Sequence, residues 1–165
     1  MEAIDDGVDL AVAAFREDGE WIVEDLTHDH LGDIETLASA LRRFPGDGGA
    51  VAMVAIDEDF FVIVRVEGAQ TQVLLSDITA ADEWELAGSA VEHLGLPEPE
   101  DDDDPAPAGH LDLLADLGVP STDMGELLDE LLDDDELFPE ETLSDVARLL
   151  GFGELFDDLV GLTPA

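Results

Sequence analysis

The sequence predicts an α+β fold: an antiparallel sheet with helices on one face, followed by a small all-helical unit. Up to residue 96, apolar runs of strand length alternate with helical repeats in the order β-β-α-β-β-β-α. Three of the strands are consecutive and have turn-length connections, which only antiparallel pairing permits. Beyond residue 109, leucines recur at helical spacing.

The first two strands are expected to form a hairpin. Val8–Arg16 is rich in valine and alanine, and Glu20–Asp25 returns after Asp18 and Gly19, two residues that tolerate a positive φ. Asp33 can cap the helix that follows. The apolar residues of that helix fall on one face: Ile34, Leu37, Ala38 and Leu41.

Three further strands are predicted. Ala50–Ile56 is a continuous apolar run, typical of a central strand that is buried on both faces. Phe60–Val66 and Gln70–Leu75 follow after short polar turns.

A second helix completes the first domain. Either Asp77 or Thr79 can cap it, and Gly95 ends it. The same order of elements occurs in longin-like and roadblock-like domains, which are protein-interaction platforms. This likeness is one of topology alone.

The chain divides into four parts. Residues 1–7 are expected to be a flexible tail, residues 8–96 the α+β domain, residues 97–109 an acidic proline-rich linker, and residues 110–165 a unit of short helices. The linker holds four of the eight prolines, so it should be extended and self-repelling. A unit of about 55 residues is marginal alone, and we expect it to dock on the first domain.

The C-terminal unit is expected to contain four helical segments. Leu111–Leu117 is the first, and Ser121 or Thr122 caps the second. Pro139 lies in the first turn of the third, and the run Gly151–Gly153 separates it from the last. Each segment has one apolar face and one face of aspartate and glutamate.

Charge is the most unusual property of the sequence. There are 44 acidic residues against 5 basic ones, all arginine, giving a net charge of −39. Residues 1–96 carry −18 and residues 97–165 carry −21, so both halves are acidic. Such a chain should bind neither nucleic acid nor an anionic membrane. A basic protein partner is favoured; the alternative is that the acidity only confers solubility, as in salt-adapted proteins.

Missing residue types exclude further classes. Without cysteine there is no disulfide, no thiolate nucleophile and no cysteine-ligated zinc. Lysine, asparagine and tyrosine are also absent, which indicates a GC-rich genome, either actinobacterial or halophilic. We find neither a signal peptide nor an apolar run of membrane-spanning length, so a cytoplasmic protein is expected.

No motif predicts catalysis, a metal or a cofactor. His28 and His30 form the only cluster that resembles metal ligands, and a polar loop between strand and helix is the better explanation of them. The acidic runs 101–104 and 133–136 lack the glycine of a calcium-binding loop. There is no G-x-S-x-G elbow, and a phosphate-binding loop of the Walker type needs a lysine.

One surface is a candidate for protein binding. Phe60 and Phe61 are consecutive in a strand and should point to opposite faces. One should then belong to the core, while the other lies under a helix or at an interface, with a homodimer as one option. The surface comprises Asp57, Glu58, Asp59, Phe60, Phe61, Asp101, Asp102, Asp103 and Asp104.

Several segments resemble the actinobacterial family of tRNA adenosine deaminase-associated proteins. The likeness extends in order over nearly the whole chain and includes the acidic linker. The segments that carry it are Leu10–Trp21, Leu41–Gly46, Asp57–Val62, Leu74–Ala80, Gly109–Gly118 and Leu149–Gly153.

The resemblance implies an association, through neighbouring genes, with the deaminase that makes wobble inosine in tRNA. It brings no catalytic residues. Zinc deaminases use H-x-E with P-C-x-x-C, and this chain has no cysteine and no His-x-Glu, so it is not itself a deaminase. The first hypothesis is an accessory protein that binds the deaminase; in its sharper version the protein competes with tRNA as an electrostatic mimic. The alternatives are a longin-like or roadblock-like dimerisation module and a metal-dependent enzyme using His28 and His30.

Overall fold

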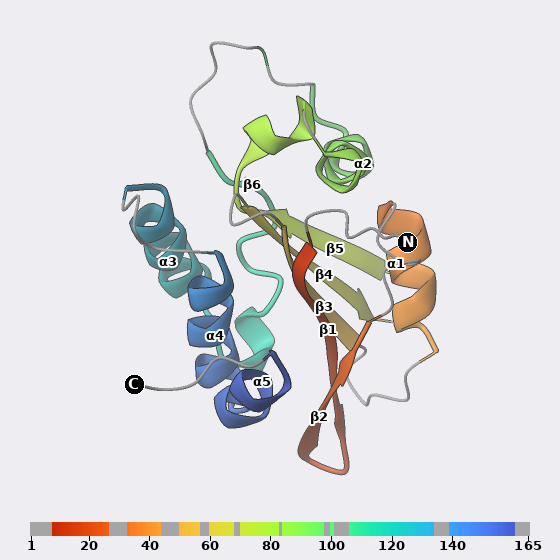
Figure 1. The fold of residues 1–165 in the computed structure, drawn as a ribbon, viewed down its shortest axis with the longest axis vertical. Coiled ribbons are helices and arrows are strands. Elements are labelled where there is room, and N and C mark those ends of the chain that lie inside the picture. The colour runs from red at the N-terminus through yellow and green to blue at the C-terminus, as the bar shows by residue number, and fades with distance from the viewer. Residues whose placement is uncertain are drawn as a thin grey trace.

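One antiparallel sheet lies between two layers of helices in the computed structural model (Figure 1). The structure describes residues 8–26, 33–43, 50–56, 60–67, 70–82, 84–97, 100, 106–133 and 139–160. The strands are β1 (Val8–Glu17), β2 (Glu20–Asp25), β3 (Ala50–Ile56), β4 (Phe60–Glu67), β5 (Gln70–Leu75) and β6 (Ala108–Gly109). Their order in the sheet is β2-β1-β3-β4-β5-β6, and every neighbouring pair is antiparallel.

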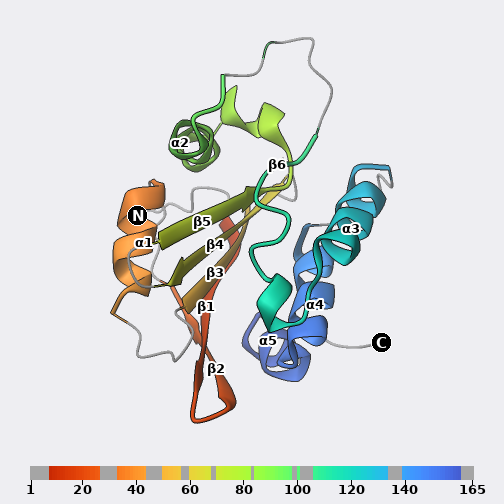
Figure 2. The ribbon, with the colours of Figure 1, turned by 180° about the vertical axis from the view of Figure 1, so that it is seen from behind.

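Helices cover both faces of the sheet, whereas the sequence predicted them on one face. The α-helices are α1 (Ile34–Leu41), α2 (Glu85–Leu94), α3 (Ser121–Asp133), α4 (Pro139–Leu150) and α5 (Gly153–Val160), and the 3₁₀-helices are η2 (Ile78–Asp82) and η3 (Ala115–Leu117). Helices α1 and α2 lie on one side of the sheet, and α3, α4 and α5 lie on the other (Figure 2). The C-terminal helices are therefore docked on the first domain.

The two layers explain why the central strands are apolar throughout. In β4, Phe60, Val62 and Val64 pack with α1 and α2, because alternate residues of a strand share a face. Phe61 and Ile63 pack with the C-terminal helices. The prediction that β3 is buried on both faces is confirmed, since all seven of its residues are buried.

Local signals place the first hairpin and helix as predicted. Asp18 and Gly19 have φ values of 56° and 84°, the conformation that a tight hairpin turn requires. The Asp33 side chain caps α1 by accepting a hydrogen bond of 2.7 Å from the Thr36 amide.

The second helix differs from the prediction of one continuous helix. It is divided into η2 and α2, with Trp84 in an extended conformation between them. The Asp77 carboxylate accepts a 2.9 Å hydrogen bond from the Thr79 amide, a local turn that competes with a regular helix start. The prediction that Gly95 ends the helix is confirmed, since its φ of 73° is left-handed.

The end of the predicted linker joins the sheet. Ala108 and Gly109 form β6 and pair with the last two residues of β5. Gly109 has a φ of 112°, and a Cβ at this position would collide with the Val73 carbonyl. Only glycine therefore allows the backbone of residue 109 to lie this close to Val73. The polar composition of the linker did not predict that its end pairs with the sheet.

The C-terminal segments agree with the prediction except at their start. Leu111–Leu117 forms turns and the short η3 in place of a longer helix. Helix α3 already begins at Ser121, so Ser121 and Thr122 lie inside its first turn. Helices α4 and α5 begin at Pro139 and Gly153 as expected.

A buried arginine joins the sheet to the C-terminal layer. Arg65 of β4 has a side chain only 3% exposed, and its face of the strand points to α3–α5. Its Nη1 donates a 2.9 Å hydrogen bond to the Leu113 carbonyl, and its Nη2 donates one of 2.9 Å to the Asp116 carboxylate. Nη1 also contacts the second oxygen of Asp116, so the ion pair is bidentate.

A tryptophan makes a second connection to the same layer. Trp21 of β2 donates a 3.0 Å hydrogen bond from Nε1 to the Leu150 carbonyl at the end of α4. Its ring lies 4.8 Å from the ring of Phe152. This connection satisfies one of the carbonyls that a helix C-terminus leaves free.

We expect Asp116→Asn to lower the free energy of unfolding by about 1–3 kcal/mol, because the buried Arg65 guanidinium loses its bidentate charged partner, while the Glu67 carboxylate is farther away at 3.6 Å. Urea unfolding followed by tryptophan fluorescence measures the change. Asp129→Asn is the matched control: this exposed residue of α3 should change stability by less than about 0.5 kcal/mol. Equal effects of the two substitutions would contradict the role of the ion pair.

The effect of Asp116→Asn should depend on pH. The hydrogen bond from Arg65 holds the pKa of the Asp116 carboxyl below its usual value of 3.8. A carboxyl with a lowered pKa stabilises the fold above its unfolded pKa, and the contribution disappears as the pH falls through its folded pKa. The stability difference between the parent chain and Asp116→Asn should therefore be constant down to about pH 5 and vanish in more acidic solution. Unfolding series across this range test it, and a difference that grows with acidity would refute it.

The two tryptophans allow a matched test of the Trp21 hydrogen bond. Trp21 and Trp84 are both partly buried, and Trp84 Nε1 has no hydrogen-bond partner among the described residues. Trp21→Phe should cost about 1 kcal/mol more than Trp84→Phe, because both remove the same volume and only the first removes a hydrogen bond. Thermal unfolding of both variants measures this, and a larger loss for Trp84→Phe would contradict it.

Candidate functional site

The acidic part of the predicted interaction surface cannot be placed. Asp57, Glu58 and Asp59 lie outside the described residues, as do Asp101, Asp102, Asp103 and Asp104. His28 and His30, the predicted metal ligands of one alternative, also lie outside them.

The two phenylalanines of the predicted surface are core residues. Phe60 and Phe61 both have 0% of their surface exposed. They point to opposite faces as predicted: Phe60 packs under α1 and α2, and Phe61 packs under the C-terminal helices. Neither is available to a partner or a second copy while both helical layers are docked, because each face of β4 is already covered.

Exposed acids line the outer helices. On α3 the exposed carboxylates are Glu126, Asp129, Glu130 and Asp133. This helix contains no basic residue and packs its buried Met124 and Leu128 against the C-terminal core. Its outer side is therefore a continuous acidic surface within the described part of the chain.

Three arginines contact neighbouring side chains. Arg65 is buried in its ion pair with Asp116, and Arg148 lies 3.0 Å from the Asp145 carboxylate on the same helix. The Arg16 guanidinium lies over the Trp21 ring, 5.5 Å from its centroid. These contacts offset three of the few positive charges and leave the acids dominant on the surface.

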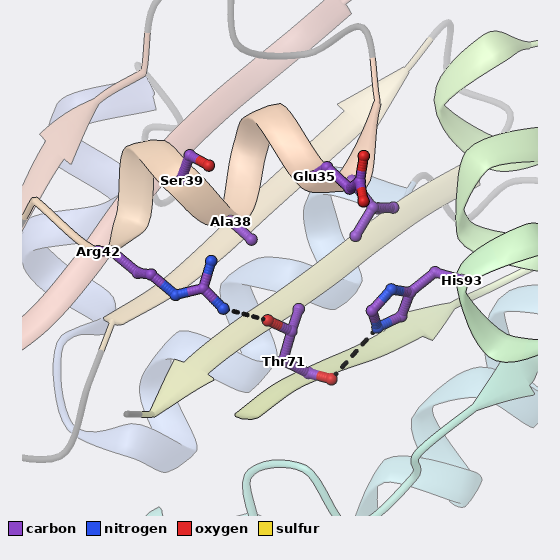
Figure 3. A pocket seen from close by; sticks show the side chains of 7 residues that line it. Glu35, Ala38, Ser39, Arg42, Thr71 and His93 are labelled. Carbon is purple, nitrogen blue, oxygen red and sulfur yellow. Dashed lines mark hydrogen bonds between the residues drawn. The ribbon is translucent and has the colours of Figure 1, made fainter. Parts of the chain in front are cut away.

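A cleft between α1 and α2 is lined by the exposed side chains of Arg42 and His93. Its volume is about 410 Å³, and Figure 3 shows the side chains that line it. Arg42 at the end of α1 donates a 2.9 Å hydrogen bond from Nη2 to the Thr71 hydroxyl. His93 in the last turn of α2 places Nε2 3.3 Å from the Thr71 carbonyl. Both side chains therefore converge on one residue of β5.

The cleft also contains two residue types that occur in nucleophilic catalysis. Ser39 and His93 both line it, and no hydrogen bond joins them within the described structure. A serine nucleophile needs such a bond to a base. The ranges that the structure describes also contain no group of three or more side chains able to hold a metal ion. None of their helices is both long and apolar enough to cross a bilayer.

Sequence reasoning did not find this cleft. No motif in the sequence connects Arg42 with His93. Position in the last turn of each helix is a weak signal, because cations are favoured at any helix C-terminus. Thr71, which joins the two side chains, comes from a third element, and nothing in its local sequence distinguishes it.

Comparison with known proteins identifies relatives of the chain. A family model described as "Rv3753c-like tRNA adenosine deaminase-associated protein" matches residues 9–153. The chain is also 34% identical over 148 residues to "Protein Rv3753c" of Mycobacterium tuberculosis, a match that covers 88% of this chain and 83% of the relative. No solved structure matches significantly.

Proposed function

This chain belongs to the family of Rv3753c-like tRNA adenosine deaminase-associated proteins, and we propose that it is a non-catalytic accessory protein that binds tRNA adenosine deaminase in the cytoplasm. The family description supports an associated protein and not a deaminase. The absence of cysteine and of His-x-Glu in the sequence also argues against deaminase chemistry.

The net charge of −39 is the main observation in support of binding through opposite charges. An enzyme that holds tRNA needs a basic surface to displace the counterions of the phosphate backbone. An acidic protein complements such a surface, and steering by the opposite charges raises the rate of association. In the sharper form of the proposal, the chain occupies this surface in place of tRNA.

We assign the contact to two acidic regions. One is the set that the sequence predicted, namely Asp57–Asp59 and the run Asp101–Asp104. The other is the exposed side of α3, where Glu126, Asp129 and Glu130 are close in sequence on a helix without basic residues. Phe60 and Phe61 are not part of the contact, because both are buried.

Co-purification with tRNA adenosine deaminase tests the proposal. We expect the two proteins to bind at an ionic strength of about 0.15 M and to separate at about 1 M, since salt screens the attraction between exposed charges. Failure to bind even at low salt would refute the proposal.

Charge-neutralising variants locate the surface. Three variants each remove three negative charges: D101N/D102N/D103N in the linker, E126Q/D129N/E130Q on α3, and E17Q/D18N/E20Q in the first hairpin as the matched control. The first two should weaken binding more than the control. An equal loss in all three would show that only the overall charge matters.

The competitive form has its own readout. If the chain occupies the tRNA-binding surface, it should raise the apparent KM of the deaminase for tRNA and leave kcat unchanged. A change in kcat at constant KM would exclude competition, while the binding test above decides whether the proteins associate at all.

A further inference from the structure

We propose that the cleft between α1 and α2 binds a small organic monocarboxylate, with the carboxylate held by Arg42 and His93. The inference is independent of the proposed function, because it concerns the one region of the described surface where positive side chains converge. The cleft volume of about 410 Å³ lies within the range of small-molecule sites.

Arg42 lines the cleft without a charged partner among the described residues. Arg65 and Arg148 are paired with carboxylates, and Arg16 lies over an aromatic ring. The side-chain partner of Arg42 is the neutral hydroxyl of Thr71, and Arg42 makes no ion pair among the described residues. A guanidinium has five N–H donors in a planar fork, so the other donors of Arg42 remain available for a planar carboxylate.

The imidazole of His93 is directed to the same place. His93 contacts the carbonyl of Thr71, and Arg42 contacts its hydroxyl, so the two heads approach each other across β5 (Figure 3). The His93 contact is long at 3.3 Å. An anion between the two groups would provide each with a charged acceptor, which forms shorter and stronger hydrogen bonds than a neutral one.

The helix wall of the cleft sets the size and charge of the ligand. Ile34 and Ala38 give it an apolar base, and Glu35 adds a negative charge at the opposite end from Arg42. Glu35 and Arg42 are seven positions apart along the helix, which is about 10 Å along its axis. A carboxylate on Arg42 thus leaves space for a short apolar body. A second negative charge on the ligand would meet Glu35.

The acidity of the whole protein limits the affinity without abolishing it. At an ionic strength of about 0.15 M, charges more than about 8 Å away are largely screened, so the nearest groups dominate. We expect a dissociation constant on the order of millimolar for a ligand of butyrate size, since so few atoms can contribute little binding free energy.

Titration of the full chain with sodium butyrate at constant ionic strength tests the proposal. Amide NMR shifts of Ser39, Arg42, Thr71 and His93 should change in a saturable manner. Butyrate should bind more tightly than acetate, because it also covers the apolar base of the cleft. Succinate and inorganic phosphate should bind more weakly than butyrate, because each brings additional negative charge towards Glu35.

Arg42→Gln should weaken butyrate binding about tenfold, which corresponds to about 1.4 kcal/mol. Arg43→Gln is the matched control, because it removes the same charge from the next residue, which does not line the cleft. Shifts that never saturate, binding to Arg42→Gln as tight as to the parent chain, or an equal loss in Arg43→Gln would each overturn the proposal.

Arg42→Lys is a second variant that helps to distinguish a lost ligand contact from misfolding of Arg42→Gln. It keeps the positive charge and lacks the planar fork, so it should bind butyrate with an affinity between those of the parent chain and Arg42→Gln. Thermal unfolding of each variant establishes that it is folded. Parent-like affinity in Arg42→Lys would show that only charge matters and would refute the bidentate contact.

Discussion

Burial of Arg65 is the constraint on which the arrangement of the C-terminal half depends. A guanidinium inside an apolar layer is tolerated only when its donors are paired, because desolvating an unpaired charge is costly. The carboxylate of Asp116 and the carbonyl of Leu113 supply the partners, and both lie in or beside η3. We infer that this pairing selects how the segment after β6 lies across the sheet.

The docked helices in turn make the sheet possible. Met53, Phe61 and Ile63 belong to the core beneath α3–α5, and without those helices they would form an exposed apolar face. Trp21 reinforces the docking from the far edge of the sheet by bonding to the end of α4. The acidic linker therefore separates two parts of one three-layer structure, although its composition resembles that of a boundary between independent units.

Charge is distributed according to the same architecture. A chain of net charge −39 repels itself, and the structure exposes acids on the outer helices, buries Arg65 and sets Arg16 and Arg148 against neighbouring side chains. The exception is the α1–α2 cleft, where Arg42 and His93 converge on Thr71. A mostly acidic surface with one cationic cleft has two chemically distinct places for recognition, a broad one for a basic protein and a small one for an anion.

The sequence alone determined the elements and the outer chemistry of this protein. Periodicity and turn residues predicted β1–β5, α1, α4 and α5 closely, because hydrophobic spacing, the Asp18-Gly19 turn and the Asp33 cap act over a few neighbouring residues. Composition predicted the acidity. Only the tertiary structure decided the second helical layer, strand β6, the burial of Phe61 and the Arg42–Thr71–His93 cleft. Each of these joins residues far apart in the chain, and long-range packing leaves no local pattern from which it can be read.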